Sequence, residues 1–111
     1  MIIEETTPID GRALVDAGAF LLDVREADEW EAGHASAAQW IPLGALPDRL
    51  DEIPTGCRIV CICRSGGRSL HAAEHLVANG RDALNLIGGM RAWAEAGLDV
   101  VTGAGDPGTV I

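Results

Sequence analysis

The sequence predicts an α/β domain built on a central parallel sheet of about five strands, with helices on both faces. Short apolar runs alternate along the chain with segments whose apolar residues recur at helical spacing. Strands that alternate with helices in this way form parallel sheets that are covered on both sides. A length of 111 residues suits one domain with its own core.

The first half of the chain opens with a clear helix signal. Thr7 is a suitable N-cap and Pro8 a suitable first residue, and Gly18 is a suitable end for this helix. A buried strand, a short acidic helix ended by Gly33, a brief strand and a short helix are expected next. These four elements are predicted at residues 19–24, 26–32, 39–41 and 42–50.

The second half contains the central strand. The apolar run Ile59–Ile62 predicts a fully buried strand within residues 58–63, and a helix is expected over residues 68–79. The core face of that helix is predicted to contain Leu70, Ala73, Leu76 and Val77. A strand at residues 83–86 and a helix at 90–96 complete a domain over residues 1–101. The glycine-rich tail, residues 102–111, is expected to be loose.

The strongest chemical signal lies directly after the central strand. There Cys63 enters a tight loop that leads into the N-terminus of a helix. Backbone N–H groups of such a loop and the helix dipole favour negative charge, and two arginines add positive charge. These conditions lower a thiol pKa and produce a thiolate nucleophile at neutral pH. The sequence therefore predicts Cys63 as nucleophile and a substrate-binding loop of Arg64, Ser65, Gly66, Gly67, Arg68 and Ser69.

Asp23 and Arg25 end another buried strand. Ligands of parallel sheets bind beyond the carboxyl ends of the strands, so the topology brings this pair and Cys63 toward one pocket. An unpaired carboxylate there would raise the pKa of Cys63, so we expect Asp23 to be bonded to Arg25 or to backbone N–H groups. The alternative is that Asp23 caps a helix and Arg25 is a solvated side chain.

The remaining cysteines and the helical histidines predict no further site. Cys61 is expected in the core and Cys57 at a partly exposed position, both as free thiols. His71 and His75 are spaced to share a metal ion, but no third ligand is evident near them, so both are expected to be solvated. No metal and no organic cofactor are predicted.

Charge and hydropathy narrow the classes of partner. The net charge of −9 argues against nucleic acid, and no apolar run approaches the ~18–20 residues that a membrane span needs. Residues 1–52 hold twelve acidic residues and three arginines, whereas residues 53–111 hold five of each. A small anionic substrate would thus meet a locally positive loop. The acidic N-terminus lacks a signal-peptide pattern, so a cytoplasmic location is expected.

Four segments in order resemble the motifs of the rhodanese family of sulfurtransferases: residues 21–34, 41–43, 63–69 and 86–93. The resemblance implies a rhodanese-like fold and a sulfane sulfur carried as a persulfide on Cys63. It suggests thiosulfate as donor, and cyanide, a small thiol or a thioredoxin-like protein as acceptor. It also implies that Asp23 and Arg25 stabilise the architecture near the loop.

Two alternatives accompany this hypothesis. A persulfide carrier or protein-interaction module without turnover would have the same loop residues, so the sequence does not separate it from an enzyme. A small cysteine-dependent phosphatase or arsenate reductase is disfavoured, because such phosphatases place five residues between cysteine and arginine. Here four residues separate Cys63 from Arg68.

Overall fold

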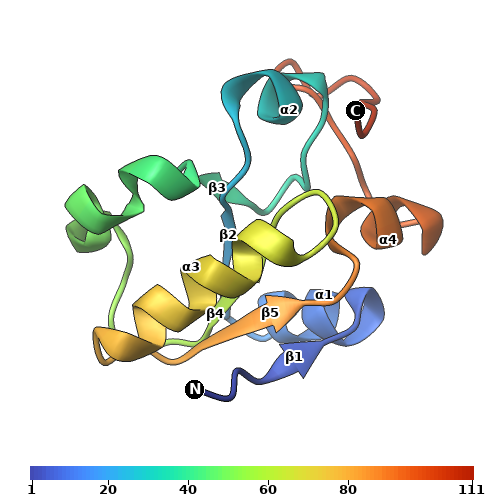
Figure 1. Cartoon of the computed structure of the whole chain (residues 1–111). Helices are drawn as coiled ribbons and strands as arrows, with labels where there is room; N and C mark the ends of the chain where they lie inside the picture. The colour runs from blue at the N-terminus through green and yellow to red at the C-terminus, as the bar shows by residue number, and fades with distance from the viewer.

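A five-stranded parallel sheet forms the centre of the structure, a computed structural model that describes residues 1–111 (Figure 1). The strand order is β1-β5-β4-β2-β3, and every neighbouring pair is parallel. The predicted class of fold is therefore confirmed. The strands are β1 (Glu5–Thr6), β2 (Phe20–Asp23), β3 (Gln39–Trp40), β4 (Ile59–Ile62) and β5 (Ala83–Leu86).

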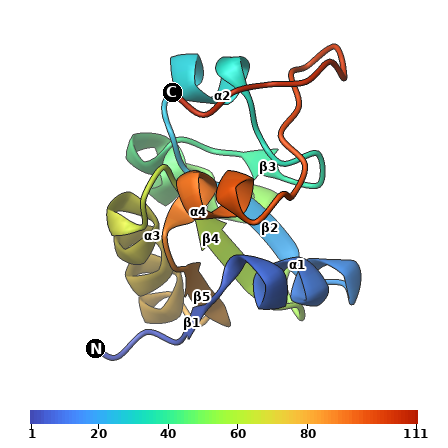
Figure 2. The same cartoon turned by 90° about the vertical axis from the view of Figure 1, so that its right-hand side faces the viewer.

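Helices cover both faces of this sheet (Figure 2). Helix α3 and the first 3₁₀ segment pack together on one face, and α1 and α4 pack together on the other. None of the helices has the length and apolar content that crossing a bilayer requires. The helices are α1 (Pro8–Asp16), α2 (Ala27–Ala32), α3 (Gly67–Ala78) and α4 (Gly89–Glu95), with 3₁₀ segments η1 (Leu43–Asp48) and η2 (Leu50–Glu52).

Each face of the sheet has its own apolar core, because successive side chains of a strand point to opposite sides. Leu22 and Cys61 belong to the cluster beneath α3, whereas Leu21 and Val60 belong to the cluster beneath α1 and α4. Strand β4 is buried along its whole length, as the apolar run predicted. Cys63 follows directly and lies in the cluster beneath α3.

Three local features differ from the sequence prediction. Strand β1 was not predicted, because a two-residue strand carries no readable periodicity; the Asn85 N–H bonds to the Glu4 carbonyl beside it. The segment from Pro42 onward forms two 3₁₀ turns rather than one helix. The buried residues of α3 are Ser69, Ala72, Ala73 and Leu76. Val77 is 36% exposed, so the core face is rotated toward Ser69.

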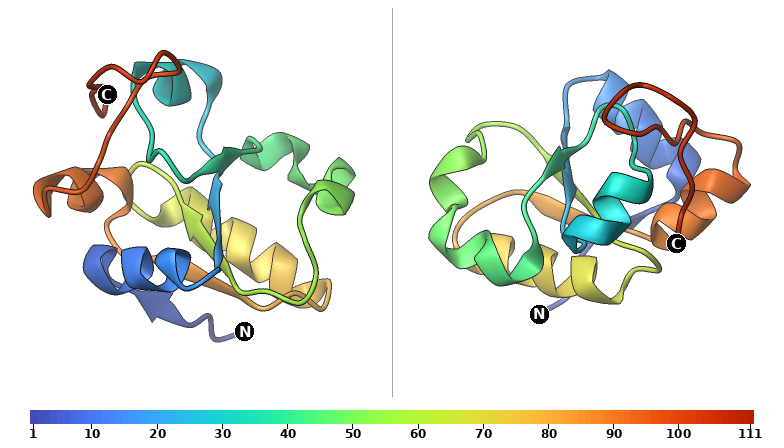
Figure 3. Two further views of the ribbon diagram at one scale, coloured as in Figure 1. Left: turned by 180° about the vertical axis from the view of Figure 1, so that it is seen from behind. Right: turned by 90° about the horizontal axis from the view of Figure 1, so that it is seen from above.

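The C-terminal segment, residues 102–111, folds back beside α2 (Figure 3). The Thr109 N–H donates to the Ala32 carbonyl, and Val101 forms bridges with His34 and Pro107. The absence of a side chain on Gly33 permits this close contact between the two backbones. A Cβ on Gly33 would lie 2.6 Å from both the N and O atoms of Thr109.

The contact at Gly33 predicts a stability effect. Gly33→Ala should lower the free energy of unfolding by about 1–3 kcal/mol, because the new methyl group collides with the Thr109 backbone. Gly103→Ala is the matched control, since a Cβ there meets nothing within 4 Å, and it should change stability by less than ~0.5 kcal/mol. Urea denaturation measures both, and equal stability of the two variants would contradict the observed packing.

Candidate active site

Cys63 lies between the carboxyl end of β4 and the N-terminus of α3, and only 1% of it is exposed. Its sulfur accepts hydrogen bonds from the Gly66 N–H at 3.1 Å and the Ser69 hydroxyl at 3.2 Å. Gly66 has a φ of +114°, a conformation that residues with a side chain rarely adopt, and this turn directs its N–H toward the sulfur. The site therefore surrounds one sulfur atom with donors.

These donors govern the ionisation of Cys63. Burial by itself would raise the pKa of the thiol. Hydrogen bonds from the Ser69 hydroxyl and from the backbone N–H groups of Ser69, Gly66 and Ser65 outweigh burial and lower the pKa below its ordinary value. For Cys61, in contrast, burial raises the pKa to about 12, with a smaller contribution from the nearby Cys63. Of these two neighbouring thiols, only Cys63 has surroundings that favour the thiolate, the nucleophilic form of a cysteine.

The turn before α4 holds the cysteine loop in place. The Met90 N–H donates to the Cys63 carbonyl at 2.8 Å, and the Arg91 N–H donates to the Arg64 carbonyl at 3.1 Å. A Cβ on Gly89 would lie 2.5 Å from the Cys63 carbonyl oxygen, and the φ of Gly89 is +58°. Glycine is therefore required there by both close approach and conformation.

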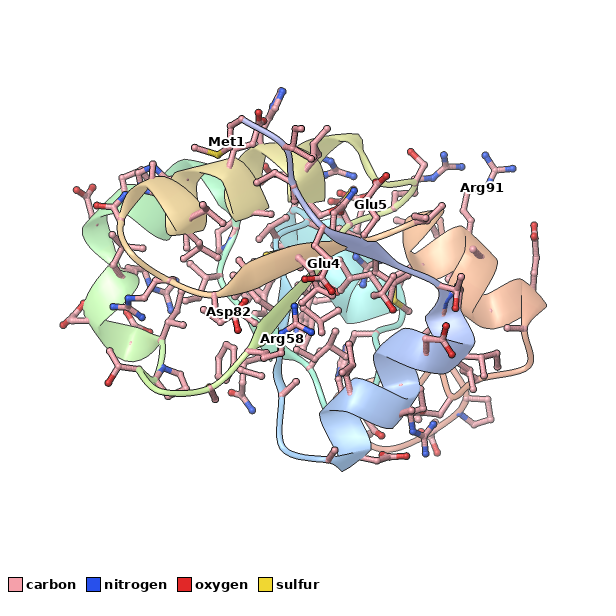
Figure 4. The ribbon with its side chains drawn as sticks, turned by 90° about the horizontal axis from the view of Figure 1, so that it is seen from below. Met1, Glu4, Glu5, Arg58, Asp82 and Arg91 are labelled. Atoms are coloured by element: carbon pink, nitrogen blue, oxygen red, sulfur yellow. The ribbon has the colours of Figure 1, made fainter.

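The two loop arginines have different surroundings. Arg68 donates two hydrogen bonds to the Glu29 carboxylate, at 2.7 and 2.8 Å, so its charge is balanced and it ties α3 to α2. Hydrogen bonding from Arg68 lowers the pKa of Glu29 to about 2. Arg64 donates only its Nε–H, to a backbone oxygen of Ile111 at 2.8 Å, and its terminal nitrogens have no protein partner. Arg91 is exposed and projects from α4 (Figure 4).

Asp23 and Arg25 form a completely buried ion pair. The Arg25 guanidinium donates to both oxygens of the Asp23 carboxylate, and the Arg25 backbone N–H donates to one of them. This confirms the bonding expected for Asp23 and excludes a solvated Arg25. Neither residue hydrogen-bonds to the cysteine loop. Their connection passes through Glu29, whose carbonyl accepts from Arg25 and whose carboxylate accepts from Arg68.

The residues that were expected to have no functional role lie outside the Cys63 site. Cys57 is partly exposed and His71 is exposed, as expected. His75 is only partly exposed, and its Nε2 atom is enclosed without a hydrogen-bond partner, which differs from the solvated position expected. No group of three or more histidine, cysteine and acidic side chains is arranged to hold a metal ion.

Two residues near Cys63 were missed by the sequence analysis. Glu29 is the partner of Arg68, and its acidic neighbours in a short helix gave no sign of this role. Asn85 is 3% exposed, and its Oδ1 lies 2.6 Å from the Ser69 Oγ. A single polar residue inside the apolar strand of residues 83–86 is the signal that would have found it.

The largest hollow in the surface, of about 870 Å³, lies away from Cys63. It opens near the amino ends of β2, β4 and β5, and Arg58 is among its lining residues. There Arg58 pairs with Glu4 and Asp82 and is not free to bind an anion (Figure 4). The chemistry therefore points to the donor-lined sulfur rather than to this hollow.

Comparison with known proteins agrees with this geometry. The model of the rhodanese-like domain matches residues 7–96. A sulfurtransferase of Allochromatium vinosum is 40% identical over 86 residues, covering 77% of this chain and 80% of the relative. The putative sulfurtransferase YtwF of Bacillus subtilis is 33% identical over 88 residues, covering 79% and 85%. The crystal structure of a rhodanese-related protein from Thermoplasma volcanium superposes with a TM-score of 0.83 at 28% identity, covering 88% of this chain and 97% of that one.

The Arg68–Glu29 pair predicts a pH dependence of stability. The pKa of Glu29 is lowered from 4.5 to about 2 in the folded protein, so the pair stabilises fully above about pH 4.5 and loses its effect as pH falls toward 2. Glu29→Gln should cost about 1 kcal/mol at pH 7, a modest value because Arg68 is partly exposed. The difference from the unmodified protein should shrink in denaturation curves recorded at pH 3. The exposed Glu31→Gln on the same helix is the control, and a difference that does not change with pH would contradict the assignment.

Proposed function

Because this chain belongs to the family of rhodanese-like domains, we propose that it moves a sulfane sulfur from an anionic donor such as thiosulfate to a thiophilic acceptor through a persulfide on Cys63. Sulfur transfer in general is the chemistry that the family and its sulfurtransferase relatives support. The observation that carries the proposal is the pair of hydrogen bonds that the Gly66 N–H and the Ser69 hydroxyl donate to the Cys63 sulfur, at 3.1 and 3.2 Å.

In the first half-reaction, the Cys63 thiolate attacks the outer sulfur of thiosulfate. The sulfur–sulfur bond of the donor breaks, its electron pair leaves with sulfite, and Cys63 becomes an anionic persulfide. The donors contributed by Ser65, Gly66 and Ser69 are placed to stabilise this anion between the two half-reactions.

In the second half-reaction, an acceptor attacks the outer sulfur of the persulfide. The new bond joins that sulfur to the acceptor, and the electron pair of the persulfide bond returns to Cys63 as thiolate. Cyanide, a small thiol or a thioredoxin-like protein can act as the acceptor in this scheme.

The surroundings of the arginines separate their roles in this proposal. The charge of Arg68 is balanced by Glu29, so Arg68 contributes to the loop architecture. The unpaired terminal nitrogens of Arg64 make it the loop residue best placed to attract the anionic donor.

Intact mass spectrometry after incubation with thiosulfate tests the proposed intermediate. The protein should gain one sulfur, roughly 32 Da, which a reducing thiol removes. Cys63→Ser should show no gain and no sulfur transfer, whereas Cys57→Ser should behave like the unmodified protein. An adduct that persists in Cys63→Ser would contradict Cys63 as the carrier.

The role of Arg64 predicts a kinetic change. Arg64→Ala should raise the KM for thiosulfate about fivefold, as expected for loss of one surface charge worth about 1 kcal/mol, and added salt should diminish the difference. Arg49→Ala removes a surface arginine that pairs with Glu52, and it should leave the KM unchanged. Equal KM values for Arg64→Ala and the unmodified protein would show that Arg64 does not meet the donor.

A further inference from the structure

Asn85 is a buried amide that is hydrogen-bonded at both its oxygen and its nitrogen. Its Oδ1 lies 2.6 Å from the Ser69 Oγ, and its Nδ2 lies 3.2 Å from both the Gly66 carbonyl oxygen and a Glu5 carboxylate oxygen. Strand β5 thus places one side chain against the two residues that donate to the Cys63 sulfur. Packing alone would favour an apolar side chain at this position, so the amide calls for an explanation.

The orientation of the Asn85 amide follows from its neighbours. The Gly66 carbonyl and the Glu5 carboxylate are both acceptors, so the NH₂ group must face them. The opposite orientation would set an amide oxygen against two other oxygens. The carbonyl end of Asn85 therefore faces the Ser69 hydroxyl.

The Ser69 hydroxyl has one proton but lies within hydrogen-bond distance of two acceptors, the Cys63 sulfur and the Asn85 Oδ1. When Cys63 is a thiol, its S–H can donate to the Ser69 oxygen while the Ser69 O–H donates to Asn85. When Cys63 loses its proton to solvent, the Ser69 O–H must turn to the sulfur. Asn85 then loses its hydrogen bond, and Ser69 keeps its own proton throughout.

We propose that Asn85 is a positioning residue of the active site, which competes with the Cys63 sulfur for the Ser69 proton and holds the Gly66 turn. Asn85 thereby sets how strongly the site favours a charged sulfur. The role rests on the proposed function only in taking Cys63 as the reacting group.

None of the charged or titratable groups around Cys63 accepts a hydrogen bond from the Ser69 hydroxyl, so Asn85 is the group that competes with the sulfur for the Ser69 proton. Arg68 of α3 interacts electrostatically with Cys63, and its charge is balanced by Glu29 of α2. Cys61 lies below on β4, and Glu5 of β1 is separated from the sulfur by Asn85 itself. The Ser69 hydroxyl contacts only the Cys63 sulfur and Asn85 among hydrogen-bonding partners.

Titration of the Cys63 thiolate by its ultraviolet absorbance tests the proposal without any sulfur donor. The chain contains no tyrosine, whose ionisation would obscure the signal. The Cys57→Ser variant serves as the background protein, and its Cys63→Ser derivative provides the baseline. The result is thus independent of whether thiosulfate is the donor or whether sulfur transfer occurs.

A double-mutant cycle between Ser69→Ala and Asn85→Leu isolates the competition. Ser69→Ala should raise the pKa of Cys63 in both backgrounds, because a donor to the thiolate is lost. The increase should be about one unit larger in the Asn85→Leu background, where the hydroxyl has no second acceptor. Any loosening of the Gly66 turn affects both arms of the cycle and cancels.

The size of the Ser69→Ala shift in the two backgrounds decides the outcome. An equal or smaller shift with Asn85→Leu would overturn the proposal and leave Asn85 a structural residue. Asn85→Ala, with circular dichroism to check the fold, replaces Asn85→Leu in the cycle if that variant does not fold, with the same expectation. Asn85→Ala should lower the pKa of Cys63, and Glu5→Ala should lower it by a smaller amount. Glu4→Ala, which removes the partner of Arg58, should leave the pKa of Cys63 unchanged.

Discussion

The convergence of hydrogen-bond donors on the Cys63 sulfur is the interaction on which the rest of this structure depends. A buried thiol ordinarily resists ionisation, and here hydrogen bonds from the Ser69 hydroxyl and from backbone N–H groups of the loop reverse that preference. The parallel sheet supplies the position, because β4 ends directly beneath the N-terminus of α3. The same donors that favour a thiolate are suited to an anionic persulfide, so one arrangement serves both states of the proposed reaction.

The loop has this shape because other parts of the chain hold it. Gly89 lets the α4 turn approach the Cys63 carbonyl, and Arg68 joins the start of α3 to Glu29. Behind Glu29, the buried Asp23–Arg25 pair fixes α2 through carbonyl groups of the chain. Breaking a buried pair of this kind leaves an uncompensated charge, so the support is both rigid and sensitive to substitution.

Much of this architecture is readable from the sequence, and the rest depends on contacts between distant residues. The apolar run before Cys63, the glycines after it and the Thr7–Pro8 cap are local signals, and they predicted the central strand, the loop and the start of α1. Strand β1 is too short to show periodicity, and the Arg68–Glu29 pair joins residues 39 positions apart. The sequence prediction misplaced the core face of α3, because Ser69 points inward and donates a hydrogen bond to the Cys63 sulfur. Helix periodicity alone does not anticipate a buried serine.

A crystal structure of the protein after treatment with thiosulfate would show directly whether the loop donors hold a persulfide on Cys63. We expect one additional sulfur on Cys63, within hydrogen-bond distance of the N–H groups of the loop that Ser65, Gly66 and Ser69 form. We also expect Arg68 to remain on Glu29 in that state. An additional sulfur on Cys57 alone would rule out Cys63 as the sulfur carrier. A sulfur on Cys63 that points away from the loop N–H groups would rule out their role in stabilising the persulfide.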